Sequence, residues 1–299
     1  MNERGIAMNG ALSVNRGWAR VVVLLIFVLN TWSCSDDSVS PKPSPESPQN
    51  CEWFWQNPLP QGYPIRDVWF AGANLGVAVG YSGTILRTTD GGSSWASQTS
   101  GTPGTLYGVT FTDANTWIAV GTYGILVRTT DGGTTWVRQK SGTTSPLFGI
   151  SFTDTETGTV VGGGGTILRT TDGGTTWVSQ TSGTTSPLFG ISFTDANMGT
   201  VVGAEGTILR TTDGGTTWVS QTSGTDAWSL GVSFTDAETG TVVGRDGAIL
   251  RTIDGGTTWV SQSSVPRHDL RSVSFTDANT GTVVGDLGTI LRTTTCGTD

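Results

Sequence analysis

The chain has 299 residues and a formal net charge of −8, with 13% charged and 35% hydrophobic residues. This composition is too apolar, and too rich in Trp, for an intrinsically disordered chain. The acidic balance argues against a nucleic-acid partner, because such a partner generally requires a basic face.

The first 33 residues have the features of a secretory signal peptide. Arg16 and Arg20 precede a short apolar run over residues 21–29, and small or polar residues follow that run. A membrane-spanning helix needs about 20 apolar residues, so this run is too short to cross a bilayer. We therefore expect residues 1–33 to direct export and to be removed.

The residues after the signal predict an anchored, extended tether. Cys34 directly follows Ser33, and this arrangement resembles the lipobox of bacterial lipoproteins, although Thr31 and Trp32 depart from its usual Leu and small residue. The resemblance implies a lipid on Cys34, and a protein held on a bacterial membrane in the periplasm or at the surface. Ordinary cleavage and secretion are the alternative. Residues 34–50, rich in Ser and Pro, form the expected tether.

Residues 51–299 consist of internal repeats. The segment T-x-D-G-G-[ST]-[ST]-W recurs at a constant interval of 41 residues. Each copy has an Asp and a Trp at equivalent positions. The aspartates are Asp90, Asp131, Asp172, Asp213 and Asp254, and the tryptophans are Trp95, Trp136, Trp177, Trp218 and Trp259. Each repeat contains four short β-branched or aromatic runs separated by Gly-rich turns, and a unit of four strands and about 40 residues has the size of a propeller blade. We predict an all-β fold, a single six-bladed β-propeller of four-stranded antiparallel blades.

The two ends of this domain complement each other. The sixth repeat breaks at Thr295 and Cys296 and stops before its Trp strand, whereas a matching strand, residues 53–56, precedes the first repeat. We expect this N-terminal strand to complete the last blade, because ring closure removes exposed sheet edges. The alignment also places Cys51 beside Cys296. In an oxidising compartment these two would form a disulfide worth about 4 to 5 kcal/mol in the chain-entropy account, and two free thiols are the alternative.

The repeat resembles the Asp-box, or BNR repeat, of sialidases, other glycoside hydrolases and sortilin-type receptors. The longer string G-T-I-L-R-T-T-D-G-G-T-T-W is closer to the photosystem II stability/assembly factor-like propeller family, and this resemblance covers residues 51–299. It implies a propeller that assists the assembly of a membrane complex, without naming a photosystem partner, because a fold does not specify a function.

The Asp-box itself is expected to be structural. Its carboxylate can accept hydrogen bonds from turn amides and Thr hydroxyls, and its Trp supplies apolar surface between blades. Each box offers a single carboxylate, whereas calcium sites use clustered ones, so we expect no metal and no cofactor.

One face of the ring carries the departures from repetition. With strands A to D from inside to outside, the D–A connections and B–C turns share this face, and the Asp-box and A–B turns share the other. Varied aromatics and arginines are typical of binding surfaces, so we expect a protein or a glycan to bind here. The candidate residues are Tyr63, Arg66, Tyr81, Tyr107, Tyr123, Phe148, Phe189, Glu205, Trp228, Arg245, Asp246, Arg267, His268 and Asp286. The alternative is that the larger aromatics only line the central channel.

Six arginines recur at the end of the third strand of each repeat. They are Arg87, Arg128, Arg169, Arg210, Arg251 and Arg292. They are either an anion-binding patch or the partners of aspartates in the F-T-D turns, and we favour pairing because desolvated Arg needs a partner. Those aspartates are Asp113, Asp154, Asp195, Asp236 and Asp277. The first repeat has Gly72 at this position, so Arg87 should be the exception.

A glycoside hydrolase, sialidase-like or of another Asp-box type, is the alternative from a different class. Such an enzyme needs two facing carboxylates, and Glu205, Asp246 and Asp286 lie on turns of the variable face. The arginines are periodic rather than a non-repeating triad, and the sequence has no nucleophile motif, metal spacing or phosphate loop. We therefore expect a non-catalytic, extracytoplasmic binding scaffold that is monomeric.

Overall fold

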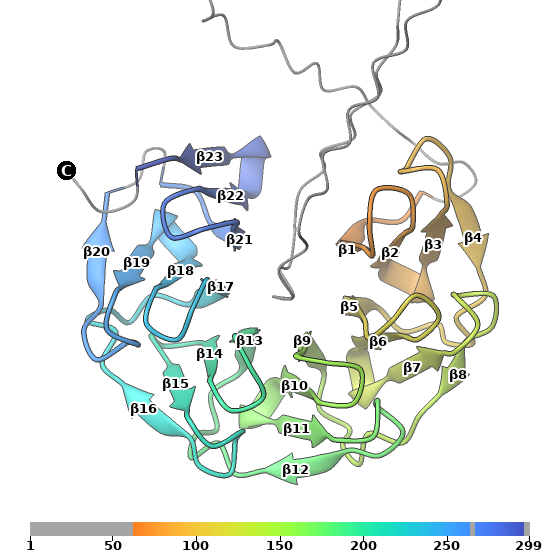
Figure 1. Cartoon of the computed structure of the whole chain (residues 1–299), viewed down its shortest axis with the longest axis horizontal. Coiled ribbons are helices and arrows are strands. Elements are labelled where there is room, and N and C mark those ends of the chain that lie inside the picture. Colours follow the sequence, from red (N-terminus) through yellow and green to blue (C-terminus); the bar gives the residue numbers. More distant parts are fainter. Residues whose placement is uncertain (1–61, 264–266, 296–299) are drawn as a thin grey trace, which may run out of the picture.

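The computed structural model describes residues 62–263 and 267–295. These residues form 23 strands in six antiparallel sheets, and the sheets stand around a common axis (Figure 1). The predicted all-β, six-bladed propeller is therefore confirmed. Within the same residues, no helix is long and apolar enough to cross a membrane.

Each of the first five sheets is a blade whose four strands follow in chain order from the axis to the rim (Figure 1). Blades 1 and 2 comprise β1 (Ile65–Phe70), β2 (Gly76–Gly80), β3 (Ile85–Thr88), β4 (Ala96–Gln98), β5 (Leu106–Phe111), β6 (Trp117–Gly121), β7 (Leu126–Thr129) and β8 (Val137–Arg138). Blades 3 and 4 comprise β9 (Leu147–Phe152), β10 (Gly158–Gly162), β11 (Ile167–Thr170), β12 (Val178–Gln180), β13 (Leu188–Phe193), β14 (Gly199–Gly203), β15 (Ile208–Thr211) and β16 (Val219–Gln221). Blade 5 comprises β17 (Ser229–Phe234), β18 (Gly240–Gly244), β19 (Ile249–Thr252) and β20 (Val260–Gln262).

Blade 6 has three strands in the described part of the chain, β21 (Leu270–Phe275), β22 (Gly281–Gly285) and β23 (Ile290–Thr293). Among these three strands β23 is the outermost, and its Ile290 is 54% exposed. The closing strand 53–56 and the Cys51–Cys296 disulfide fall on residues outside the described ones, as do the signal peptide, Cys34 and the tether. These expectations stay predictions.

The hydrophobic core lies between neighbouring blades. Successive side chains of a strand point to opposite faces, so Val160 of β10 packs toward blade 2 and Val161 packs toward blade 4. Both valines are fully buried, and each such side chain contributes about 1.5 to 3 kcal/mol relative to exposure. Blade 3 therefore packs through buried apolar side chains against both of its neighbours.

Backbone hydrogen bonds define the two faces of the ring. On one face, which we call the variable face, the B–C turn bonds to the D–A connection: the amide of Gly163 donates to Pro146 O at 2.8 Å. On the opposite Asp-box face, the amide of Gly173 donates to Glu156 O of the A–B turn at 2.9 Å. This is the arrangement of turns expected from the sequence.

Candidate functional site

The Asp-box carboxylates are satisfied within their own turns. In blade 3, Oδ1 of Asp172 accepts hydrogen bonds from Thr170 Oγ1 at 2.8 Å and from the Thr176 amide at 2.8 Å, and Oδ2 accepts one from Thr176 Oγ1 at 2.6 Å. These bonds, led by that of the Thr176 hydroxyl, lower the pKa of Asp172 to about 2. The same contacts recur at Asp90, Asp131, Asp213 and Asp254. No group of three or more potential metal ligands lies together among the described residues.

The Asp-box Trp residues join strands and blades. Trp218 stands edge-on to Phe193 of its own blade, with ring centroids 6.1 Å apart at 89°. Its Nε1 donates to Gln180 Oε1 of the preceding blade at 3.4 Å, and Gln180 Nε2 donates to Gly214 O at 3.3 Å. The box therefore contributes to blade packing as well as to its own turn.

The arginine ring is mainly a set of contacts between blades. Arg210 is 6% exposed; its Nη1 donates to Thr200 Oγ1 at 2.8 Å and its Nη2 to Ala237 O of the next blade at 2.5 Å. Arg169 and Arg251 make the equivalent bonds. Because these guanidinium groups are used internally, they do not form an open anion-binding ring.

The expected pairing of these arginines with the F-T-D aspartates is found as an electrostatic attraction, as between Asp195 and Arg210, but not as an ion pair. Among the described residues no ion pair joins the two sets. Asp195, for example, accepts the amides of Asn197 at 2.7 Å and Met198 at 2.9 Å. The aspartates close their own turns in this way, and in three turns the adjacent carbonyl, of Ala196, Ala237 or Ala278, accepts a ring arginine.

The other three arginines differ. Arg128 donates from Nε to Gly173 O at 2.8 Å, and Arg292 is exposed on β23. Arg87 makes no hydrogen bond within the described residues, and its Nε is buried. The expectation for Arg87 rested on Gly72, which stands where the other turns have an aspartate, but Arg128 and Arg292 also depart from the pattern of blades 3 to 5.

On the variable face, four predicted aromatic residues form a continuous arc across blades 2 to 5. The ring centroids of Tyr107 and Phe148 are 5.3 Å apart, and those of Phe148 and Phe189 are 5.4 Å apart. Phe189 and Trp228 stack at 5.5 Å and 25°. All four side chains are partly buried. We refer to Tyr107, Phe148, Phe189 and Trp228 as the aromatic arc.

Guanidinium groups lie at both ends of the aromatic arc. Arg66 of β1 has its Cζ 4.7 Å from the Tyr81 ring centroid and 6.0 Å from that of Tyr107, and it donates to the Tyr81 hydroxyl. At the other end, Cζ of Arg245 is 3.8 Å from the Trp228 centroid. Three further predicted residues, Arg66, Tyr81 and Arg245, therefore belong to the same surface as the arc.

Blade 6 adds an ion-pair cluster in which Asp286 was predicted from the sequence and Arg271 and Asp269 were not. Arg271 binds both Asp286 oxygens, at 2.8 and 2.6 Å, and approaches Asp269 at 3.3 Å. Asp269 also lies 3.9 Å from Arg245, which connects the cluster to the aromatic arc. Arg271 occupies the strand position that holds Phe148 in blade 3, and this departure was the available signal.

The remaining predicted residues lie away from the arc. Tyr63 is 55% exposed and Tyr123, at a turn tip, is 75% exposed. Glu205 accepts a bond from Ser186 Oγ at 3.2 Å, and His268 Nδ1 lies 2.9 Å from Thr289 Oγ1. Two more, Asp246 and Arg267, are exposed.

Among the carboxylates considered for glycoside hydrolysis, Asp286 is bound by Arg271. The pKa of Asp286 is lowered, first by its hydrogen bond from Arg271, whereas a glycosidase acid needs a raised pKa. Glu205 and Asp246 occupy the tips of B–C turns in blades 4 and 5, with φ values of 54° and 55°.

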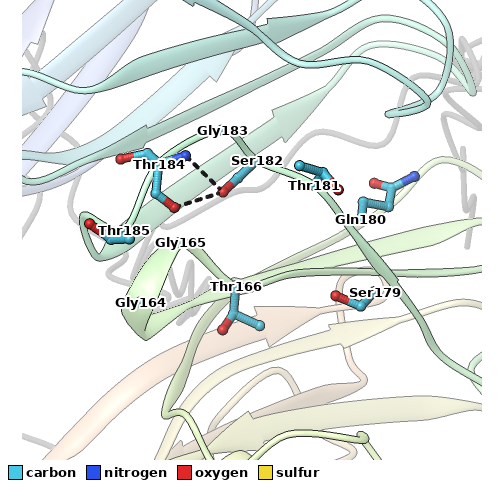
Figure 2. Close-up of a pocket in the computed structure, with 10 residues that line it drawn as sticks. All are labelled: Gly164, Gly165, Thr166, Ser179, Gln180, Thr181, Ser182, Gly183, Thr184 and Thr185. Carbon is cyan, nitrogen blue, oxygen red and sulfur yellow. Dashed lines mark hydrogen bonds between the residues drawn. The ribbon is translucent and has the colours of Figure 1, made fainter.

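A shallow polar groove lies farther out on the variable face of blade 3 (Figure 2). It has a volume of about 680 Å³ and is lined by Gly, Ser, Thr and Gln side chains of residues 164–166 and 179–185. Ser182 Oγ is bonded to Thr184 O at 3.1 Å and accepts the Thr184 amide at 3.3 Å, so its polar groups are partly used internally (Figure 2). A similar groove recurs in blade 2, which marks it as a feature of the repeat.

Sequence comparison identifies the family. Residues 47–146 and 221–299 match the family model described as the photosynthesis system II assembly factor YCF48. The chain belongs to this family. No curated protein sequence matches it. The aromatic arc and its flanking arginines are thus features of a YCF48-family propeller.

The solved structures that the chain matches include a YCF48 structure and GH74 enzymes. YCF48 bound to a D1 peptide is 20% identical and matches over 80% of this chain and 94% of that chain, with a TM-score of 0.47. The GH74 enzyme of Niastella koreensis is 16% identical over 76% of this chain and 44% of its own, with a TM-score of 0.65. The GH74 xyloglucanase of Xanthomonas campestris is 12% identical over 78% and 45%, with a TM-score of 0.64. The GH74 likeness shows the propeller fold alone.

Proposed function

We propose that this YCF48-family propeller is a non-catalytic, extracytoplasmic scaffold that binds a segment of a partner protein across its variable face. The observation that carries the proposal is the aromatic arc, which crosses four blades and has a guanidinium at each end. Aromatic residues and Arg are the side chains that dominate protein interfaces. The family description as an assembly factor supports a protein partner as well.

The packing of the arc favours a protein segment over a glycan. Sugar rings bind aromatic side chains by lying flat on an exposed ring face. Here Trp228 stacks on Phe189 and also carries the Arg245 guanidinium, while Phe148 packs between Tyr107 and Phe189. The arc therefore presents mainly ring edges and polar tips, which suit the side chains and backbone of a peptide.

The location of this scaffold follows from the sequence features ahead of the propeller. Export by residues 1–33, a lipid on Cys34 and the tether over residues 34–50 would hold the ring close to a bacterial membrane. A membrane-bound or secreted partner would then be within reach. Without the lipid, the same propeller would act in solution outside the cytoplasm.

Capture from membranes tests the proposal. The parent protein and the Trp228→Ala variant serve as baits, and captured proteins are identified by mass spectrometry and then purified for direct binding. Trp228→Ala should weaken binding of the purified partner about 30-fold, as expected for a Trp that anchors an interface. The matched control is Tyr123→Ala, an exposed residue of the same face away from the arc. Equal binding by the parent and Trp228→Ala, or turnover of a glycan by the parent protein, would overturn the proposal.

A further inference from the structure

On the Asp-box face, Arg87 lacks the hydroxyl partner that its counterparts in blades 3 to 5 use, and Arg128, which lies opposite Ile118, lacks it as well. In blades 3 to 5 each ring arginine donates to a Thr that lies opposite it on the second strand, as Arg210 does to Thr200. In blade 1 the residue opposite Arg87 is Val77, which has no polar group to offer. Because Val77 replaces the Thr of blades 3 to 5, Arg87 has no hydroxyl acceptor on the second strand.

The second acceptor is taken by another side chain. The carbonyl of Ala114 corresponds to the Ala237 carbonyl that binds Arg210, but it accepts Trp117 Nε1 at 3.2 Å. Trp117 stands where the later repeats have a Gly at the start of the second strand. Cζ of Arg87 lies 5.8 Å from the Trp117 ring centroid. Arg87 thus rests on an aromatic ring and has no acceptor among the described residues.

A second donor in the same cluster is also unpaired. Trp136, whose ring centroid is 6.2 Å from that of Trp117, has a buried Nε1 without a hydrogen-bond partner. Its counterpart Trp218 donates to Gln180 of the preceding blade. The ring of Trp117 fills that space, since a Cβ on Gly133 would stand 2.3 Å from Trp117 Cζ3. The junction of blades 1 and 2 therefore holds two buried donors, Arg87 Nε and Trp136 Nε1, that have no hydrogen-bond partner.

Nearby carboxylates do not compensate Arg87. The Asp131 oxygens accept bonds from Thr129 Oγ1, from the Thr135 amide and from Thr135 Oγ1. Oδ1 of Asp113 accepts the amides of its own turn at 2.7 and 2.8 Å. Neither forms an ion pair with Arg87 in the part of the chain that the structure describes. Arg87 as a whole is half-buried and its Nε is buried, so an external group has to reach the guanidinium at its Nη atoms.

We propose that Arg87 is the centre of an oxyanion-binding site at the junction of blades 1 and 2, on the face opposite the aromatic arc. The ligand is a carboxylate or a phosphate, because the planar donor edge of a guanidinium matches two oxygens of either group. The Trp117 ring supports the cation from below and holds it in place. This site is independent of the partner site proposed for the variable face.

Arginine side-chain NMR tests the site with inorganic phosphate and, separately, acetate at constant ionic strength. The Nε–Hε signal of Arg87 should shift and saturate, while the signals of Arg169, Arg210 and Arg251 should not. A response to phosphate alone, or to acetate alone, identifies the source of the oxyanion. Absence of a saturating Arg87 shift with either probe, or equal shifts at all ring arginines, would overturn the proposal.

Restoring the missing partner gives the sharper control. Val77→Thr places opposite Arg87 the hydroxyl found in blades 3 to 5, and it should weaken anion binding about tenfold, the change that corresponds to one charged hydrogen bond. The matched variant Thr200→Val removes that hydroxyl from Arg210 but leaves the Ala237 carbonyl, so it should create no anion response. If Val77→Thr does not fold, Arg87→Met replaces it and should abolish the response. Unchanged anion affinity in the folded variant contradicts the site.

Discussion

The Cζ atom of Arg245 lies 3.8 Å from the centroid of the Trp228 ring. The backbone fixes this contact, because the Arg245 amide donates to Trp228 O at 2.9 Å and so joins the B–C turn to the D–A connection. Phe189 covers the indole at 5.5 Å from the neighbouring blade. One end of the aromatic arc is thus preorganised in the unliganded ring, which reduces the entropy lost when a partner binds.

The Arg245–Trp228 contact should be measurable as a coupling energy. Arg245 is 44% exposed at its side chain, so we expect about 0.5 to 1 kcal/mol of coupling rather than the larger value of a buried pair. A double-mutant cycle of Arg245→Leu and Trp228→Leu, followed by urea unfolding, gives this quantity. The cycle of Arg245→Leu with Tyr123→Leu is the control and should show no coupling. A coupling energy of zero in the first cycle would show that the contact between Arg245 and Trp228 does not stabilise the fold.

The ring arginines should differ in their contribution to stability. Arg210→Met removes bonds to Thr200 and to Ala237 O from a nearly buried side chain, and it should lower the free energy of unfolding by about 2 kcal/mol. Arg87→Met removes no hydrogen bond among the described residues and should change it by less than about 0.5 kcal/mol. Urea unfolding of both variants tests the difference. Equal losses would show that the contacts between blades contribute no more than the Arg side chain itself.

Much of this architecture could be predicted from the sequence, because each repeat carries the same strand and turn signals. A strand pattern, an Asp-box and a Trp at a fixed interval require a blade at each copy. The acceptors of the ring arginines could not be predicted in this way. Arg210 binds the carbonyl of Ala237, and a carbonyl is present at every residue, so no side-chain pattern marks it.

Most residues of the candidate site could be predicted from the sequence, but the contacts between them could not. Phe148 and Phe189 occupy the same strand position, so a shared surface could be expected, but Trp228 lies one residue before its strand. Its stacking on Phe189 depends on the path of the D–A connection. Arg271 was overlooked because a single charged residue in a strand carries no pattern of its own, and only its distance from Asp286 shows its role.

Acid should destabilise the propeller through the Asp-boxes. The pKa values of Asp90, Asp131, Asp172 and Asp254 are lowered from 3.8 to about 2 by hydrogen bonds from their own turns. A depressed pKa in the folded state gives stability that is complete above the unfolded value and is lost as the pH falls through the folded value. We therefore expect stability to decline from about pH 4 and to have lost this contribution below about pH 2.

Urea unfolding between pH 5 and pH 2 measures this dependence. Thr176→Val removes the strongest hydroxyl donor to Asp172, so the variant should be less stable at pH 5 and should lose less stability on acidification. Val178→Thr, an exposed change on the adjacent rim strand, is the control and should keep the parent's pH profile. A Thr176→Val profile parallel to that of the parent would exclude Asp172 as a source of the acid sensitivity.

Closure of the ring should depend on Cys51 and Cys296. Blade 6 shows three strands in the described part of the chain, and the strand predicted at residues 53–56 would be the fourth, next to β23. If that strand pairs with β23, the two cysteines lie on either side of one hairpin and can oxidise. Cys296→Ser should then lower the melting temperature by about 10 °C, the effect of roughly 4 kcal/mol in a domain of this size. A reducing agent should lower the melting temperature of the parent protein by a similar amount and leave that of Cys296→Ser unchanged.

Peptide mapping without reduction tests the disulfide directly and should recover the two cysteines in one linked fragment. Recovery of both as free thiols would contradict closure by a disulfide. Deletion of residues 53–56 would then test the strand pairing separately.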